Sequence, residues 1–109
     1  MATKLRVLGQ ALPTANTFWD MYAVPTGNSA VVSTLNVCNL TSSNVTFRAA
    51  VRPANVALLP KHYIAYDIAL PAQDAIGLTM GISLDATDVV TVFSFQGNVA
   101  FNLFGSEIY

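Results

Sequence analysis

The sequence predicts an all-β protein: an antiparallel two-sheet β-sandwich of the jelly-roll or Greek-key type, with about 7–8 strands. Three observations support this prediction. Runs of β-branched and aromatic residues recur along the chain, and turn-forming residues separate them at intervals of roughly 8 to 12 residues. Within several runs the apolar residues fall two apart. No uninterrupted stretch shows the three- and four-residue apolar spacing of an amphipathic helix.

Turn residues delimit four strands in the first half of the chain. Pro13 ends the first strand, and the Pro-Thr-Gly-Asn turn at residues 25–28 closes the second. Proline presets the first angle of such a turn, and glycine accepts a positive φ. Residues 41–44 are expected to form a hairpin loop into the fourth strand. The predicted strands cover residues 4–12, 19–24, 29–39 and 45–52.

The fourth strand has the clearest alternation. Its apolar residues are two apart, and Arg48 and Arg52 fall between them on the opposite face. The residues expected on its apolar face are Val45, Phe47, Ala49 and Val51. The connection that follows, residues 53–60, mixes proline with Ala, Val and Leu. We expect it to cross between the two sheets, with at most one short helical turn within residues 54–61.

Four more strands are predicted in the second half, at residues 62–70, 76–84, 89–95 and 99–107, with a tight hairpin at 96–98. In the first of these, one face is expected to carry Ile64, Tyr66, Ile68 and Leu70. In the second, one face is expected to carry Ile76, Leu78, Met80, Ile82 and Leu84. Gly77 and Gly81 lie opposite and suggest a bulge or the close approach of another backbone.

Size and composition predict a single domain, residues 1–109, that associates with other subunits. Hydrophobic residues make up 53% of the chain and charged residues only 10%, against roughly 25% charged in typical soluble domains. A surface so poor in charge favours subunit contacts over a monomer covered by Ser, Thr and Asn. We therefore expect a homo-oligomer, in particular a trimer.

Nucleic acids and membranes are not expected as partners. Five Lys and Arg against six Asp and Glu, a net charge of −1, leave no basic surface for phosphates. No apolar run reaches the roughly 18 residues that span a bilayer. Lys4 and Arg6 interrupt the apolar residues near the N-terminus, so no signal peptide is expected.

Neither catalysis nor a bound cofactor is expected. His62 is the only histidine and Cys38 the only cysteine, and neither belongs to a nucleophile elbow or a glycine-rich phosphate loop. We expect Cys38 to fill a core position and His62 to begin a strand. Asp85 and Asp88 could in principle bind a cation, but a turn explains their spacing without a metal.

Two further groups of residues are candidates for structural contacts. Asp67 interrupts an apolar strand and is expected to form an ion pair with Arg48 or Arg52 on a neighbouring strand. Aromatic residues also occur on both faces of the C-terminal strands, although a sandwich buries one face of each sheet. We expect another subunit to cover the second face, the alternative being a hydrophobic crossing beneath a loop. The interface candidates are Phe18, Trp19, Phe93, Phe95, Phe101, Phe104 and Tyr109.

Three segments resemble a known family. Residues 22–27 read Tyr-Ala-Val-Pro-Thr-Gly, residues 30–39 read Ala-Val-Val-Ser-Thr-Leu-Asn-Val-Cys-Asn, and residues 101–108 read Phe-Asn-Leu-Phe-Gly-Ser-Glu-Ile. Together they resemble small β-sandwich virion structural proteins of tailed bacteriophages, in which a Val-Pro-x-Gly turn precedes a long strand ending in Cys-Asn. The resemblance covers about residues 22–108, and its motifs are those of strands and turns.

The resemblance implies a virion protein, in the first place a capsid cement or decoration protein that stabilises the shell as an oligomer. Its partners would be copies of itself and the major capsid protein. A tail, baseplate or fibre accessory protein is the alternative. A carbohydrate-binding module of a receptor-binding apparatus also fits a β-sandwich, with Trp19 and Tyr66 as stacking platforms if they are exposed and flanked by Asp or Asn.

Overall fold

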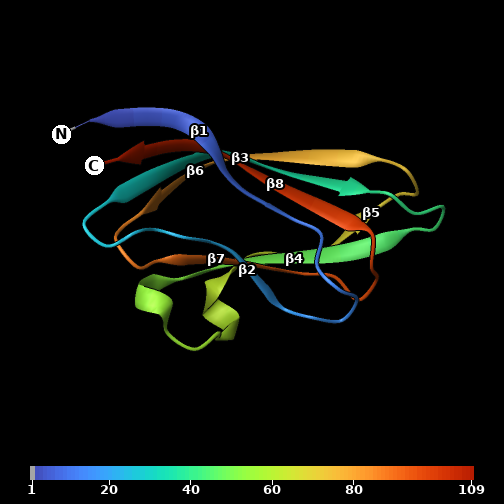
Figure 1. Ribbon diagram of the computed structural model, residues 1–109. Helices are drawn as coiled ribbons and strands as arrows, with labels where there is room; N and C mark the ends of the chain where they lie inside the picture. The colour runs from blue at the N-terminus through green and yellow to red at the C-terminus, as the bar shows by residue number, and fades with distance from the viewer. Residues whose placement is uncertain (1) are drawn as a thin grey trace.

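The computed structural model describes residues 2–109 as two four-stranded antiparallel sheets packed face to face (Figure 1), which confirms the predicted fold class. The strands are β1 (Thr3–Ala11), β2 (Trp19–Ala23), β3 (Ser29–Asn39), β4 (Val45–Arg52), β5 (Tyr63–Leu70), β6 (Ala75–Leu84), β7 (Val89–Phe93) and β8 (Val99–Ile108). Two short 3₁₀ turns, η1 (Pro53–Asn55) and η2 (Pro60–His62), lie between β4 and β5. Within residues 2–109, no helix is long and apolar enough to cross a membrane.

The strand order is that of a jelly roll. Sheet 1 has the order β1-β8-β3-β6, and sheet 2 has the order β2-β7-β4-β5. Antiparallel ladders join β1 to β8, β2 to β7, β3 to β6 and β4 to β5, as in a long ribbon that is folded back on itself and then rolled up. Further ladders from β3 to β8 and from β4 to β7 complete the two four-stranded sheets.

Strand alternation builds the core between the sheets. The predicted apolar face of β4 points inward, where Val45, Phe47 and Ala49 are buried. Phe47 of sheet 2 meets Phe101 of sheet 1 edge to face, with ring centroids 6.1 Å apart. The strand boundaries lie within two residues of the predicted ones throughout. The period-two pattern therefore located the strands and the buried face of β4 correctly.

Three predicted connections are wrong. Residues 53–62 do not cross between the sheets, because β4 and β5 are neighbours in sheet 2. The segment is a long loop that joins two paired strands, and it is called here the excursion between β4 and β5. Conversely, residues 41–44 and 96–98 were predicted to be hairpins, but each joins strands of different sheets. Turn residues mark where a strand ends, whereas the choice of the next partner depends on how whole faces are buried.

A bulge in β5 overturns the predicted alternation of that strand. Two of its residues, Tyr66 and Asp67, lie opposite the single residue Arg48 of β4, and the register shifts there. Asp67 has a φ of 48°, in the left-handed region. As a result Ala65 takes a core position while Tyr66 turns out to solvent. Such bulges commonly re-aim side chains.

A buried amide fastens one end of the sandwich. Asn39, at the end of β3, donates hydrogen bonds to the carbonyls of Ser43 at 2.8 Å, Leu70 at 3.3 Å and Pro71 at 3.0 Å. Its carbonyl oxygen accepts the backbone N–H of Thr41 at 2.9 Å. One side chain thus ties the crossing from β3 to β4 to the crossing from β5 to β6.

Candidate interaction surfaces

The outer face of sheet 1 carries no charged side chain. The register places Leu5 and Val7 of β1 on this face, while Arg6 points to the inner side and binds Glu107. The same alternation applies to the other three strands. The outward residues, called here the uncharged face, are Thr3, Leu5, Val7, Gln10, Ser29, Val31, Thr34, Asn36, Cys38, Ala75, Gly77, Thr79, Ser83, Ala100, Asn102, Phe104, Ser106 and Ile108.

Four apolar side chains of the uncharged face are exposed close to one another. The exposed fractions are 84% for Leu5, 46% for Val7, 40% for Val31 and 38% for Phe104. Val7 lies directly opposite Phe104, and Leu5 and Val31 pair with Ser106 from its two sides. Contiguous exposed apolar surface of this kind marks interaction sites. Because no charge must be desolvated, contact here avoids a large energetic cost.

The uncharged face ends at an edge strand that carries neither charge nor proline. β6 forms one edge of sheet 1 and has ten residues, none of them charged and none of them proline. Soluble proteins usually protect such an edge with lysine, proline or a covering loop. A bulge opposite Ser33 is the irregularity in its ladder with β3. The composition of β6 therefore favours contact with another chain.

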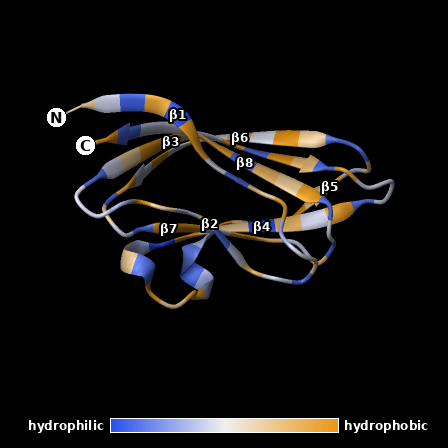
Figure 2. Cartoon of the chain, in the orientation of Figure 1, coloured by the Kyte–Doolittle hydropathy of each residue, from blue (hydrophilic) through white to orange (hydrophobic). Residues whose placement is uncertain are grey.

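The outer face of sheet 2 is built around the two arginines of β4. Arg52 donates to the carboxylate of Asp20 at 2.8 Å, to the hydroxyl of Thr91 at 3.0 Å and to the carbonyl of Val56 at 2.8 Å. The last bond holds the excursion between β4 and β5 against the sheet. Figure 2 shows that the link between the two 3₁₀ turns is hydrophobic, although it lies outside the sheets.

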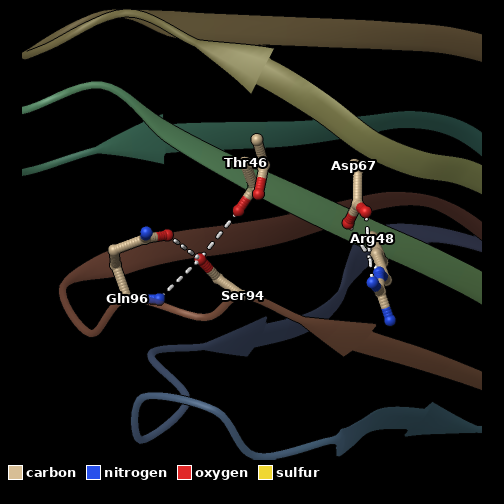
Figure 3. A network of polar contacts seen from close by, with 5 residues as sticks. All are labelled: Thr46, Arg48, Asp67, Ser94 and Gln96. Carbon is tan, nitrogen blue, oxygen red and sulfur yellow. Dashed lines mark hydrogen bonds and ion pairs between the residues drawn. The ribbon is translucent and has the colours of Figure 1, made fainter.

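Arg48 binds Asp67 through two parallel hydrogen bonds (Figure 3). Nε lies 2.6 Å from Oδ1 and Nη2 lies 3.1 Å from Oδ2. The hydrogen bonds from Arg48 hold the pKa of the Asp67 carboxyl below its usual value. Asp67 thus pairs with one of the two arginines expected for it, and Arg52 pairs with Asp20 instead.

Four aromatic rings surround the Arg48 guanidinium. Its central carbon lies 4.3 Å from the ring centroid of Tyr66, 5.0 Å from Phe95, 5.1 Å from Phe93 and 6.0 Å from Tyr63. These distances lie within the range of cation–π attraction. Arg48, Asp67 and these four rings are called the Arg48 cluster below. Near it, the hydroxyl of Ser94 donates to the carbonyl of Thr46 at 2.8 Å (Figure 3).

The aromatic interface candidates do not form one surface. Phe101 lies in the core, and Phe93 is covered by Phe18 and Phe95, whose ring centroids lie 4.3 Å and 4.8 Å away. Phe104 alone belongs to the uncharged face. Phe18 and Phe95 are partly exposed on the outer face of sheet 2. The other two candidates lie elsewhere.

Trp19 and Tyr109 are half exposed beside two shallow clefts. Trp19 lines a cleft of about 250 Å³ together with Leu12 and Pro13 of the connection from β1 to β2. Tyr109 lines one of about 320 Å³ near Gly27. Trp19 is paired with an inward residue of β7, so it does not share the outer face of sheet 2 with the Arg48 cluster.

Cys38 is not in the core, contrary to the prediction. The inward positions at this end of β3 belong to Val37 and Asn39, so Cys38 lies between them on the uncharged face, opposite Ala75 and Ala100. His62 does not begin a strand: it is buried in η2, immediately before β5. Cys38 thus belongs to sheet 1, whereas His62 lies in the turn that precedes β5 of sheet 2.

The carboxylates of Asp85 and Asp88 accept backbone hydrogen bonds at the turn between β6 and β7. Asp88 accepts the backbone N–H of Asp85 at 2.8 Å and that of Ala54 at 2.9 Å. Asp85 accepts the N–H of Ala86 at 2.8 Å. In the part of the chain that the structure describes, no group of three His, Cys, Asp or Glu is placed to hold a metal ion.

A buried carboxylate joins the two sheets. Glu107 of β8 accepts the hydroxyl of Tyr22 from β2 at 2.5 Å and Nη1 of Arg6 from β1 at 3.1 Å. Burial raises the pKa of Tyr22 well above its usual value, and the hydrogen bond to Glu107 adds to the increase. The two hydrogen bonds provide the buried Glu107 carboxylate with partners from both sheets, so we interpret this arrangement as a contact that stabilises the fold.

Two clefts flank the excursion between β4 and β5. The smaller, of about 490 Å³, is lined by Leu58, Leu59, Pro60, Tyr63 and Tyr66. The larger, of about 790 Å³, is lined by Val51, Pro53, Val56, Ala57, Leu59, Lys61, His62 and Ile64. The smaller cleft therefore adjoins the Arg48 cluster through its two tyrosines.

No protein-family model matches the chain, and no curated protein matches it. The jelly-roll fold hosts unrelated functions, so a role has to be argued from the surfaces.

Proposed function

We propose that the protein is a non-enzymatic structural subunit that packs against copies of itself through the uncharged face of sheet 1. The observation that supports this most strongly is the group of Leu5, Val7, Val31 and Phe104, exposed on a four-stranded face without any charged side chain. The setting proposed for this subunit is a bacteriophage virion, with a role as capsid cement or decoration protein.

The energetics of such a contact suit a repeated assembly. Burying an unpaired charge costs several kcal/mol, and the uncharged face avoids that cost over the whole width of the sheet. The free edge of β6 adds unpaired backbone groups at its border. Each contact can be modest, because symmetry repeats it many times over a shell. Such association should also depend little on salt.

The virion setting rests on the resemblance of residues 22–27, 30–39 and 101–108 to small phage structural proteins. A cement subunit binds after the shell has closed and adds to its stability by mass action. Particles that lack the protein should therefore assemble but break at a lower temperature than complete particles. Normal heads without complete tails would instead support a role as a tail, baseplate or fibre accessory protein.

Matched glutamate substitutions test the proposed contact. L5E and V31E place a charge on the uncharged face, whereas L40E and V56E do so at apolar positions elsewhere that are 56% and 45% exposed. We expect L5E and V31E to convert the oligomer to monomer in light scattering at micromolar concentration, with an unchanged circular dichroism spectrum. The two control variants should remain oligomeric. A monomeric wild type, or equal effects of both pairs, would contradict the proposal.

A further inference from the structure

We propose that the outer face of sheet 2 holds a binding site for neutral sugars, centred on Tyr66 and Asp67 where the 490 Å³ cleft adjoins the Arg48 cluster. This site lies on the opposite side of the sandwich from the uncharged face. It is therefore a second function, separate from the proposed subunit contact.

The cleft has the size and the apolar walls of a small-ligand site, and Asp67, the residue after Tyr66, lies just outside its lining. Such sites commonly measure roughly 300 to 1,000 Å³ and combine apolar walls with a few placed polar groups. One wall here consists of Tyr63 and Tyr66, whose rings meet edge to face with centroids 4.9 Å apart. Residues 58–60 form the other wall. Tyr66 is 57% exposed, so its ring can be covered by a ligand.

The backbone at this site is held in a costly conformation. Asp67 has a φ of 48° inside a strand, a conformation that residues with a side chain rarely adopt and that tends to occur at functional sites. The bulge that contains it turns Tyr66 away from the core and directs the Asp67 carboxylate to Arg48. Arg48 in turn lies over the Tyr66 ring and fixes its orientation. The strained residue thus positions both groups of the proposed site.

The chemistry of these groups fits a neutral pyranose. A sugar ring offers a flat C–H face to an aromatic ring and hydroxyl donors to a carboxylate. Asp67 accepts two N–H groups from Arg48, and its oxygens retain further lone pairs for hydroxyl groups. Because the ion pair is neutral as a whole, it offers no excess positive charge to an acidic ligand. A proline-rich peptide would use the tyrosine rings but leave the carboxylate unused.

The test uses the intact chain and a panel of neutral oligosaccharides built from glucose, galactose, mannose or N-acetylglucosamine. Binding is measured by calorimetry and by NMR shift changes at Tyr66 and Asp67. We expect at least one oligosaccharide to bind, Y66A to weaken it about tenfold or more, and Y66F to retain it. D67N should weaken it about tenfold, since a hydrogen bond to a charged acceptor is replaced by a weaker one.

Trp19 supplies a matched control. It is 52% exposed and is followed by Asp20, much as Tyr66 is followed by Asp67, but it lines a different cleft. W19A should therefore bind sugars as the wild type does. The proposal is overturned if no oligosaccharide of the panel binds, if W19A loses binding while Y66A keeps it, or if a polyproline peptide is the only probe that binds. Y66A changes sheet 2 and leaves the uncharged face of sheet 1 as it is, so this variant should remain oligomeric. Loss of sugar binding with the oligomer retained then assigns the loss to this site and not to the subunit contact.

Discussion

Two buried polar side chains, Glu107 and Asn39, stabilise opposite ends of β3 and its partners. Glu107 pairs across from Ala30 at the start of β3, whereas Asn39 ends that strand. Each is satisfied by groups from segments far apart in the sequence. A buried polar group in this situation specifies one arrangement of the sheets, because any other would leave it without partners.

Replacing Tyr22 by Phe should destabilise the protein. The buried carboxylate of Glu107 would lose the hydroxyl that lies 2.5 Å away and keep only Arg6 as a partner. We expect the free energy of unfolding to fall by about 1–3 kcal/mol, measured by urea denaturation at neutral pH. An unchanged unfolding midpoint would show that water replaces the hydroxyl without cost.

The same variant should change the response to alkaline pH. The pKa of Tyr22 is raised in the folded state, so above a pH of about 10 the unfolded chain loses this proton before the folded chain does. The wild type should therefore lose stability as the pH rises beyond about 10, and Y22F should lose less of it. Parallel pH profiles for the two proteins would contradict the assignment.

Single residues were predictable where alternation alone decides their side of the sheet. Arg48 and Arg52 lie on the outer face of β4 as the pattern predicted, and Asp67 binds Arg48. The prediction for Cys38 is wrong, because its neighbours Val37 and Asn39 hold the inward positions and the apolar character of a thiol does not decide its side of the strand. The Arg48 cluster was not foreseen as a unit, since the bulge that assembles it depends on a backbone angle.

At the scale of elements, the close approach of strands depends on individual glycines. A Cβ atom on Gly105 of β8 would overlap the carbonyl oxygen of Val31 in β3. A Cβ atom on Gly81 of β6 would meet no atom within 4 Å. Both glycines lie in sheet 1, so they form a matched pair for the cost of adding one methyl group to a strand.

Changing Gly105 to Ala should therefore destabilise the protein, whereas changing Gly81 to Ala should not. Overpacking against a backbone atom costs about 1–3 kcal/mol or more, because no side chain can move aside to relieve it. We expect G105A to unfold at a clearly lower temperature than the wild type, and G81A to unfold within a few degrees of it. Equal melting temperatures for both variants would contradict the close packing of β8 on β3.

The elements themselves were predicted well from the sequence, but their connections were not. The ranges of β3 and β4 agree residue for residue with the prediction, because turn residues and alternation are local signals. Residues 53–62 stay within sheet 2, and all the other connections cross between the sheets. Whether a connection stays in one sheet or crosses to the other depends on which long-range ladders bury the most apolar surface. The residues of the connection itself do not show this.

At the scale of the whole molecule, the sandwich presents two outer faces of different chemistry. The face of sheet 1 is uncharged and partly apolar, whereas the face of sheet 2 carries the ion pairs of Arg48 and Arg52 and the neighbouring clefts. The low charge content of the sequence predicted association in general. The absence of charge from the outer face of sheet 1 could be recognised only after the register of each strand was known.

The reactivity of Cys38 tests the central claim, that the uncharged face is a contact between copies of this chain. Cys38 is the only cysteine and lies on this face, at the end of β3 away from Val31, so alkylation of its thiol reports whether the contact extends along β3 over the face. The rate should fall as protein concentration rises through the range in which light scattering shows oligomers, and L5E should restore the fast rate. A rate that is the same for monomer and oligomer, together with an oligomer that persists in L5E, would contradict the claim, because the oligomer would then be held together by another surface.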